Sequence, residues 1–247
     1  MKKLFPPMHS RPETGMVFAL IPCWLWVFVL FPMWMPFMGL GLWEKPEASA
    51  WLEIGYHVIN GVAMAVIMRS YFKEEWFMVT TDVRFYLKHI VLTAGCMMAA
   101  VVAVLFAMIF SGGNIRGMLN GLPVVEMFVS QTPSFLVSTS PVYGTVTLSL
   151  FSPISICVLF YAFGFAPLCG KRPWMGYLCV AALVLLPPLV NILWRGEAEI
   201  VLEIYLIQLP VHLLACWSYQ KTDNIFTPMV SLGLMNLAAA VAIIFLF

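Results

Sequence analysis

The sequence predicts an all-α fold in which the helices form a bundle across a membrane. Of the 247 residues, 62% are hydrophobic and only 10% are charged, whereas a soluble domain carries about 25% charged residues. The mean hydropathy is +0.93. The apolar residues form runs of about 20 residues without the alternation of a transmembrane strand. We therefore expect a polytopic membrane helix bundle with about seven transmembrane helices.

The predicted elements follow the apolar runs. Residues 1–15 are basic and contain prolines, which indicates a cytoplasmic tail, and residues 16–247 are expected to form a single transmembrane domain. Membrane helices tolerate proline because neighbouring groups satisfy the freed carbonyls, but Pro187-Pro188 is expected to interrupt the fifth span. The predicted spans cover residues 16–43, 51–68, 90–110, 141–168, 174–194, 200–219 and 225–247.

Two segments between the spans are distinctive. Residues 69–89 are rich in charge, and their second half, VRFYLKH at 83–89, is typical of a short helix at the membrane interface. Glu74 and Glu75 look like a paired carboxylate, but in so charged a stretch we expect them to lie on a solvated face. Residues 111–140 are the longest non-spanning stretch, and their glycines and prolines favour a loop.

The basic residues predict the orientation. With seven spans the two ends of the chain lie on opposite sides, and ten of the 13 Lys and Arg residues fall on the side of the N-terminus. Because cytoplasmic loops carry the excess of positive charge, we expect a multi-pass cell-membrane protein with its N-terminus cytoplasmic and its C-terminus outside. The lipid bilayer is the expected partner, and the net charge of +1 indicates no nucleic-acid partner.

Polar side chains inside apolar spans are candidate functional residues, because they are costly there. Glu53 and His57 are spaced i and i+4, so they share one helical face. The pair is able to bind a divalent metal or activate water, or to form a structural hydrogen bond near the interface. His212 follows Pro210 by two residues, so its ring is a candidate catalytic group or a partner for a carbonyl that the proline frees. Asn236 suits a hydrogen bond between helices.

One region carries a family resemblance. Residues 219–228, YQKTDNIFTP, match a turn of the type Y-x-x-T-x-N-I-x-x-P that leads into an HxxxN motif, and Asn236 falls on the Asn of that motif. Pro153 stands where a proline precedes an EExxxR motif, and the KRPW ending at Trp174 matches the following loop. On these residues, the region of about 145–240 resembles the CAAX protease and bacteriocin-processing (CPBP) family of intramembrane proteases. The resemblance implies a CPBP-like helical fold.

The resemblance also implies where the family's chemistry would lie. Its glutamates activate water and its histidines complete the polar site, and hydrolysis needs such a general base. In this chain apolar or uncharged residues replace them. A thiol in lipid keeps its proton, which makes it a poor nucleophile. We therefore expect Cys157, like the other five scattered cysteines, to be a small core residue and not a catalytic group. The glutamates become Ile156 and Cys157, the arginine becomes Tyr161, the FxxxH motif falls near Val184 and Pro188, and the histidine of HxxxN becomes Leu232.

These residues leave three functional hypotheses. The first is a catalytically inactive CPBP-like protein without a cofactor, which binds a membrane protein or an exported peptide as an immunity, regulatory or assembly factor. The alternative is an active intramembrane metalloprotease that uses Glu53, His57 and His212 with zinc or another divalent metal. The second alternative is a small-molecule or lipid transporter, for which buried polar residues are the only cue.

Overall fold

A computed structural model describes residues 12–26, 46–110, 140–169, 172–195 and 198–246, and every structural statement below concerns these residues. All regular structure within them is helical, which confirms the predicted all-α class. One continuous helix, called here the central helix, runs from 141 to 169. It consists of α9 Pro141–Val146, the π-helical η2 Thr147–Phe151, α10 Ser152–Ile156, the π-helical η3 Cys157–Phe165 and α11 Ala166–Cys169.

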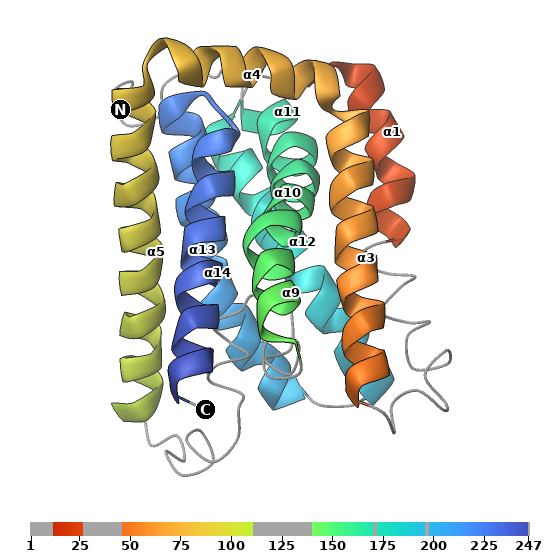
Figure 1. The fold of residues 1–247 in the computed structure, drawn as a ribbon, viewed down its shortest axis with the longest axis vertical. Helices are drawn as coiled ribbons and strands as arrows, with labels where there is room; N and C mark the ends of the chain where they lie inside the picture. The colour runs from red at the N-terminus through yellow and green to blue at the C-terminus, as the bar shows by residue number, and fades with distance from the viewer. Residues whose placement is uncertain (1–11, 27–45, 111–139, 170–171, 196–197, 247) are drawn as a thin grey trace.

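The other helices surround the central helix. Most of them run along the long axis of the molecule, and α4 crosses one end, which we call the α4 end (Figure 1). The turn between α13 and α14 also lies at the α4 end, because its residues contact α4. The surrounding helices are α1 Thr14–Leu25, α3 Pro46–Ile67, α4 Arg69–Thr81, α5 Val83–Phe110, α12 Pro173–Arg195, α13 Ala198–Thr222 and α14 Phe226–Leu246.

Each predicted span coincides with a described helix, although only residues 16–26 of the first span are described. Two local expectations are wrong. Residues 83–89 are not a separate helix but the first turns of α5, because Asp82 Oδ1 accepts the N–H of Phe85 at 3.1 Å and caps the helix there. Pro187-Pro188 does not interrupt α12, which runs to Arg195; the proline ring fits helical φ, and the loss of its N–H and its clash with the carbonyl four residues earlier are costs that do not end the helix here. The loop predicted at 111–140 lies outside the described residues except for Ser140.

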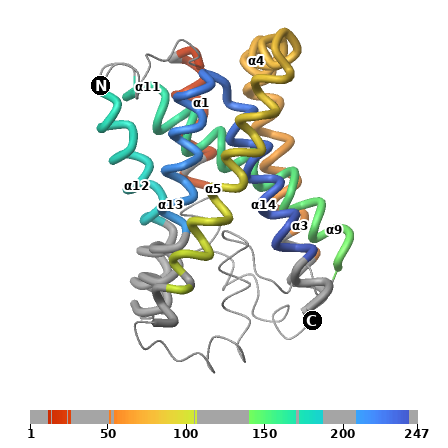
Figure 2. The backbone as a smooth tube through the Cα atoms, turned by 90° about the vertical axis from the view of Figure 1, so that its left-hand side faces the viewer, coloured from red at the N-terminus to blue at the C-terminus, as the bar shows by residue number. Residues whose placement is uncertain are grey.

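The cluster of buried apolar side chains that forms the core includes most of η3 in the central helix, whose backbone path among the other helices can be followed in Figure 2. α3 packs on η2 and α10, α12 packs on η3 and α11, and α14 packs on η2 and α9. The largest fully buried side chains include Tyr161, Phe160 and Phe165 of η3. Outer faces are apolar too, and Val91 of α5 is 60% exposed.

Two helical stretches, Val83–Val104 and Pro141–Cys169, are long and apolar enough to cross a membrane. This is weak evidence for membrane spans, because a buried core helix of a soluble protein passes the same test of length and composition. The second stretch is indeed mostly buried among its neighbours.

Candidate functional site

The π-helical turn beside Pro153 leaves one backbone carbonyl of the central helix without a backbone donor. In an α-helix the carbonyl of Leu148 would accept the N–H of Ser152, but this N–H bonds to the carbonyl of Thr147 instead. A π-type bond would have to come from residue 153, and Pro153 has no N–H. The carbonyl of Leu148 therefore needs a partner from another element, since a buried unpaired carbonyl is costly.

Asn236 supplies that partner. It lies on α14, its side chain is 1% exposed, and its Nδ2 donates to the carbonyl of Leu148 at 2.9 Å. Asn236 is also the residue that matches the family-like HxxxN motif. In this structure its amide is engaged in joining α14 to the central helix, a role that the sequence interpretation of Asn as an interhelical link anticipates.

Gly233 allows α14 to lie this close. A Cβ at Gly233 would lie 2.5 Å from the carbonyl oxygen of Ser149 on the central helix. In an α-helix the Ser149 carbonyl would accept the N–H of residue 153, but Pro153 has no N–H. The Ser149 carbonyl therefore lacks this donor, and it faces the backbone of α14 at Gly233.

The positions compared with the family's charged motif residues lie in the apolar core. Ile156 is 3% exposed, and Cys157 and Tyr161 are fully buried. Leu232, at the position of the family histidine, is also buried. All four belong to one cluster of buried side chains.

His212 is buried on α13 and hydrogen-bonds to the side chain at the position of the family arginine. Its Nδ1 and the hydroxyl of Tyr161 lie 2.8 Å apart, and the ring of Phe160 packs edge-on with its centroid 5.0 Å away. One of the two roles expected for this ring, pairing with a carbonyl freed by Pro210, is not the bond that Nδ1 makes, because η3 presents the Tyr161 hydroxyl instead. The sequence gives no signal for this pairing, since the two residues are 51 positions apart.

The structure gives no common site for Glu53, His57 and His212. The side chain of Glu53 lies outside what is described. His57 lies on α3 beside the ring of Tyr56, whereas His212 is on α13, and these two helices stand apart in both views (Figures 1 and 2). Among the described residues, no group of three or more His, Cys, Asp or Glu side chains is placed to hold a metal ion.

Glu75 forms an interhelical contact that the sequence interpretation missed. It is 3% exposed, and its Oε2 accepts the N–H of Ile225 at 3.0 Å. Asn224 Nδ2 donates to the carbonyl of Glu75 at 2.8 Å. The expected solvated face is therefore wrong for Glu75, although its neighbour Glu74 is exposed. A carboxylate is favourable at this place because the N-terminus of α14 presents unpaired N–H groups and the positive end of its dipole.

The turn between α13 and α14 is shaped to receive Glu75. Asn224 Oδ1 accepts the N–H of Phe226 at 2.9 Å and caps α14. Asp223 has a φ of 51°, the left-handed region that Asp and Asn tolerate better than most side chains. Beside the turn, the hydroxyls of Tyr71 on α4 and Tyr219 on α13 are hydrogen-bonded to each other. Residues 219–226 therefore hold α4 against the ends of α13 and α14.

Several buried side-chain atoms make no hydrogen bond to the described residues. Two of them belong to the residues above, Nε2 of His212 and Oδ1 of Asn236. The others are Asn60 Nδ2, Thr145 Oγ1, Ser149 Oγ, Gln208 Oε1 and Thr227 Oγ1. The described interior therefore contains donors and acceptors that are not used by the hydrogen bonds of Asn236, His212 and Glu75.

Comparisons of the chain with models of protein families, with curated proteins and with solved structures found no match.

Proposed function

We propose that the chain is a multispan membrane protein with a CPBP-like fold and without peptidase activity. It acts by binding, as an immunity, regulatory or assembly factor for a membrane protein or an exported peptide. The observation that carries the proposal is the burial of Ile156 and Cys157 in the apolar core, at the positions where the resembling family has its glutamates.

The hydrogen bonds of the remaining polar residues support this proposal. Peptide hydrolysis needs a general base and a donor that polarises the attacked carbonyl. The amide of Asn236 is bonded to the Leu148 carbonyl, and Nδ1 of His212 is bonded to Tyr161. Each bond satisfies a buried polar group, so using either side chain as a catalyst would leave its present partner unpaired.

The proposal includes the membrane location and the orientation. The exposed charged side chains of the described residues lie near the α4 end, and the outer faces of the long helices expose apolar residues such as Val91 and Leu178. This distribution suits a chain with its α4 end at the cytoplasmic surface and its lateral faces in lipid. Extraction of membranes at alkaline pH tests the location, since an integral protein stays in the pellet.

A cleavage assay tests the absence of peptidase activity. The purified chain is incubated in detergent with a set of membrane peptides, with and without added zinc, and the products are measured by mass spectrometry. We expect no turnover above the protein-free blank. Zinc-dependent turnover that His57→Ala and His212→Ala both abolish, and that His89→Ala leaves intact, would contradict the proposal and support a metalloprotease. His89 is the matched control because its ring bonds to the carbonyl of Phe85 within α5.

A further inference from the structure

Six exposed basic side chains gather near the α4 end of the bundle. We call them the cation ring: Arg69, Lys73, Arg84, Lys88, Arg172 and Lys221. The exposed acidic side chains of the described residues are Glu13, Glu74 and Asp82. Exposed cations therefore outnumber exposed acids there by three, while Asp223 in the turn between α13 and α14 is partly exposed and Glu75 of α4 is buried.

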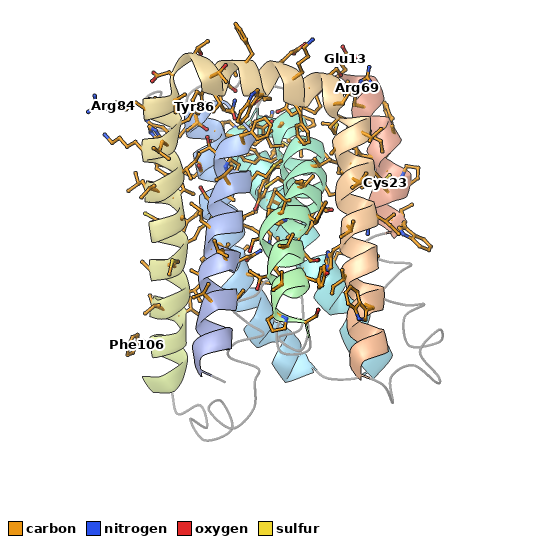
Figure 3. The ribbon with its side chains drawn as sticks, viewed as in Figure 1. Glu13, Cys23, Arg69, Arg84, Tyr86 and Phe106 are labelled. Atoms are coloured by element: carbon orange, nitrogen blue, oxygen red, sulfur yellow. The ribbon has the colours of Figure 1, made fainter. Side chains whose placement is uncertain are left out.

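The cation ring is spread around the perimeter of the bundle. Its members come from α4, from the first turns of α5, from the residue before α12 and from the last turn of α13. Figure 3 shows Arg69 and Arg84 on opposite sides of the molecule, near the two ends of α4. A partner bound against one side of the bundle would therefore meet only part of the ring.

The lateral surface becomes apolar immediately next to the ring. On α5, Leu87 and Val91 are exposed within one turn or two of Arg84 and Lys88, and on α12, Leu178 is exposed in the second turn. Trp174, in the first turn of α12, is 57% exposed. Aromatic rings and basic side chains at the edge of an apolar band are the pattern of a membrane–water interface. The ring thus stands at the level where lipid headgroups lie.

We infer that the cation ring binds the phosphate groups of anionic phospholipids in the leaflet at the α4 end. The inference rests on the proposed membrane location and names a lipid partner for it. Arginine and lysine both pair with phosphate, arginine in a bidentate manner. Lipid headgroups are the occupants because they surround a bundle on all sides, as the ring does, and because their charge is opposite to that of the ring.

Titration of the purified full chain in neutral detergent with phosphatidylglycerol or phosphatidylcholine tests the inference, with native mass spectrometry to count bound lipids. We expect tighter binding of phosphatidylglycerol, which weakens as salt is added. Arg84→Gln and Lys88→Gln should each lower the affinity for phosphatidylglycerol by up to about five-fold, the effect of one basic residue near an anionic surface. Lys88→Arg should retain the affinity, and Glu74→Gln should raise it, because it removes an acid from the same end.

Three results would overturn the inference. The first is equal affinity for the two lipids, and the second is an unchanged preference in the Arg84→Gln/Lys88→Gln double variant. The third is displacement of phosphatidylglycerol by soluble polyglutamate at equal charge concentration, which would assign the ring to an acidic protein partner. If the chain stays in alkali-washed membranes but shows no preference for anionic lipid, this inference is wrong and the proposed membrane location stands. If alkaline extraction removes the chain from membranes, the proposed location is wrong as well.

Discussion

The bond between Asn236 and the Leu148 carbonyl gives a prediction that separates a structural from a catalytic role. Asn236→Leu keeps a side chain of similar size but removes the donor. The carbonyl is then buried without a partner, which costs about 1–3 kcal/mol. For a chain of this length that corresponds to a fall in Tm of roughly 2–12 °C. Unfolding in detergent micelles, followed by tryptophan fluorescence, measures the change.

Pro153 makes this prediction specific, because it is the reason that the carbonyl lacks a backbone donor. Pro153→Ala restores an N–H to the central helix, so Asn236→Leu should cost less in the Pro153→Ala background than in the parent chain. The two changes should therefore be coupled by about 1 kcal/mol or more, within the range seen for residues that share a hydrogen-bond network. Additive effects would refute the reasoning that the proline and the π-helical turn orphan the carbonyl that Asn236 satisfies.

Three further predictions concern the other contacts. Glu75→Ala removes the acceptor of the Ile225 N–H and should lower the free energy of unfolding by about 1.5–3 kcal/mol, as expected for a hydrogen bond to a charged group. Tyr161→Phe leaves Nδ1 of His212 buried without its partner and should cost about 1–3 kcal/mol by the same measurement. Gly233→Ala places a methyl group against the central-helix backbone and should cost about 1–3 kcal/mol, because the core cannot accept extra volume there.

Each of these substitutions has a matched control at an open position. Glu74→Ala and Tyr143→Phe alter exposed side chains, so each should change stability by less than about 0.5 kcal/mol. A Cβ at Gly95 of α5 meets no atom within 4 Å, and Gly95→Ala should stabilise the helix by up to about 1 kcal/mol. If a test variant and its control lose the same free energy of unfolding, the contact removed by the test variant does not stabilise the fold.

The positions of most helices were predictable from the sequence, whereas the contacts between them were not. The described helices other than α4 lie on the apolar runs, but α4 Arg69–Thr81 lies in the charge-rich stretch at 69–89, where the sequence indicates a helix only from residue 83. Local chemistry misled at two places. Asp82 caps α5 before the expected start of the third span, and Pro187-Pro188 fits within α12.

The role of Glu75 shows why the rest of the site escaped prediction. A glutamate beside Glu74, in a stretch rich in charge, has the sequence signature of a solvated residue. Its partner Ile225 is 150 positions away and offers a backbone N–H, which no side-chain pattern reveals. The pairing of Tyr161 with His212 is equally remote. For Asn236, the sequence favours an interhelical bond, but its acceptor depends on the π-helical turn beside Pro153.

Reactivity of Cys157 tests the central claim most directly, because this residue occupies a position where a water-activating glutamate would stand in the resembling family. A variant that keeps Cys157 as its only cysteine is treated with a water-soluble maleimide in native detergent solution, beside a cysteine-free chain carrying Glu74→Cys. We predict that Glu74→Cys is labelled rapidly and that Cys157 is labelled only after unfolding. Labelling of native Cys157 at a rate near that of Glu74→Cys would show a hydrated site at this position and contradict the account.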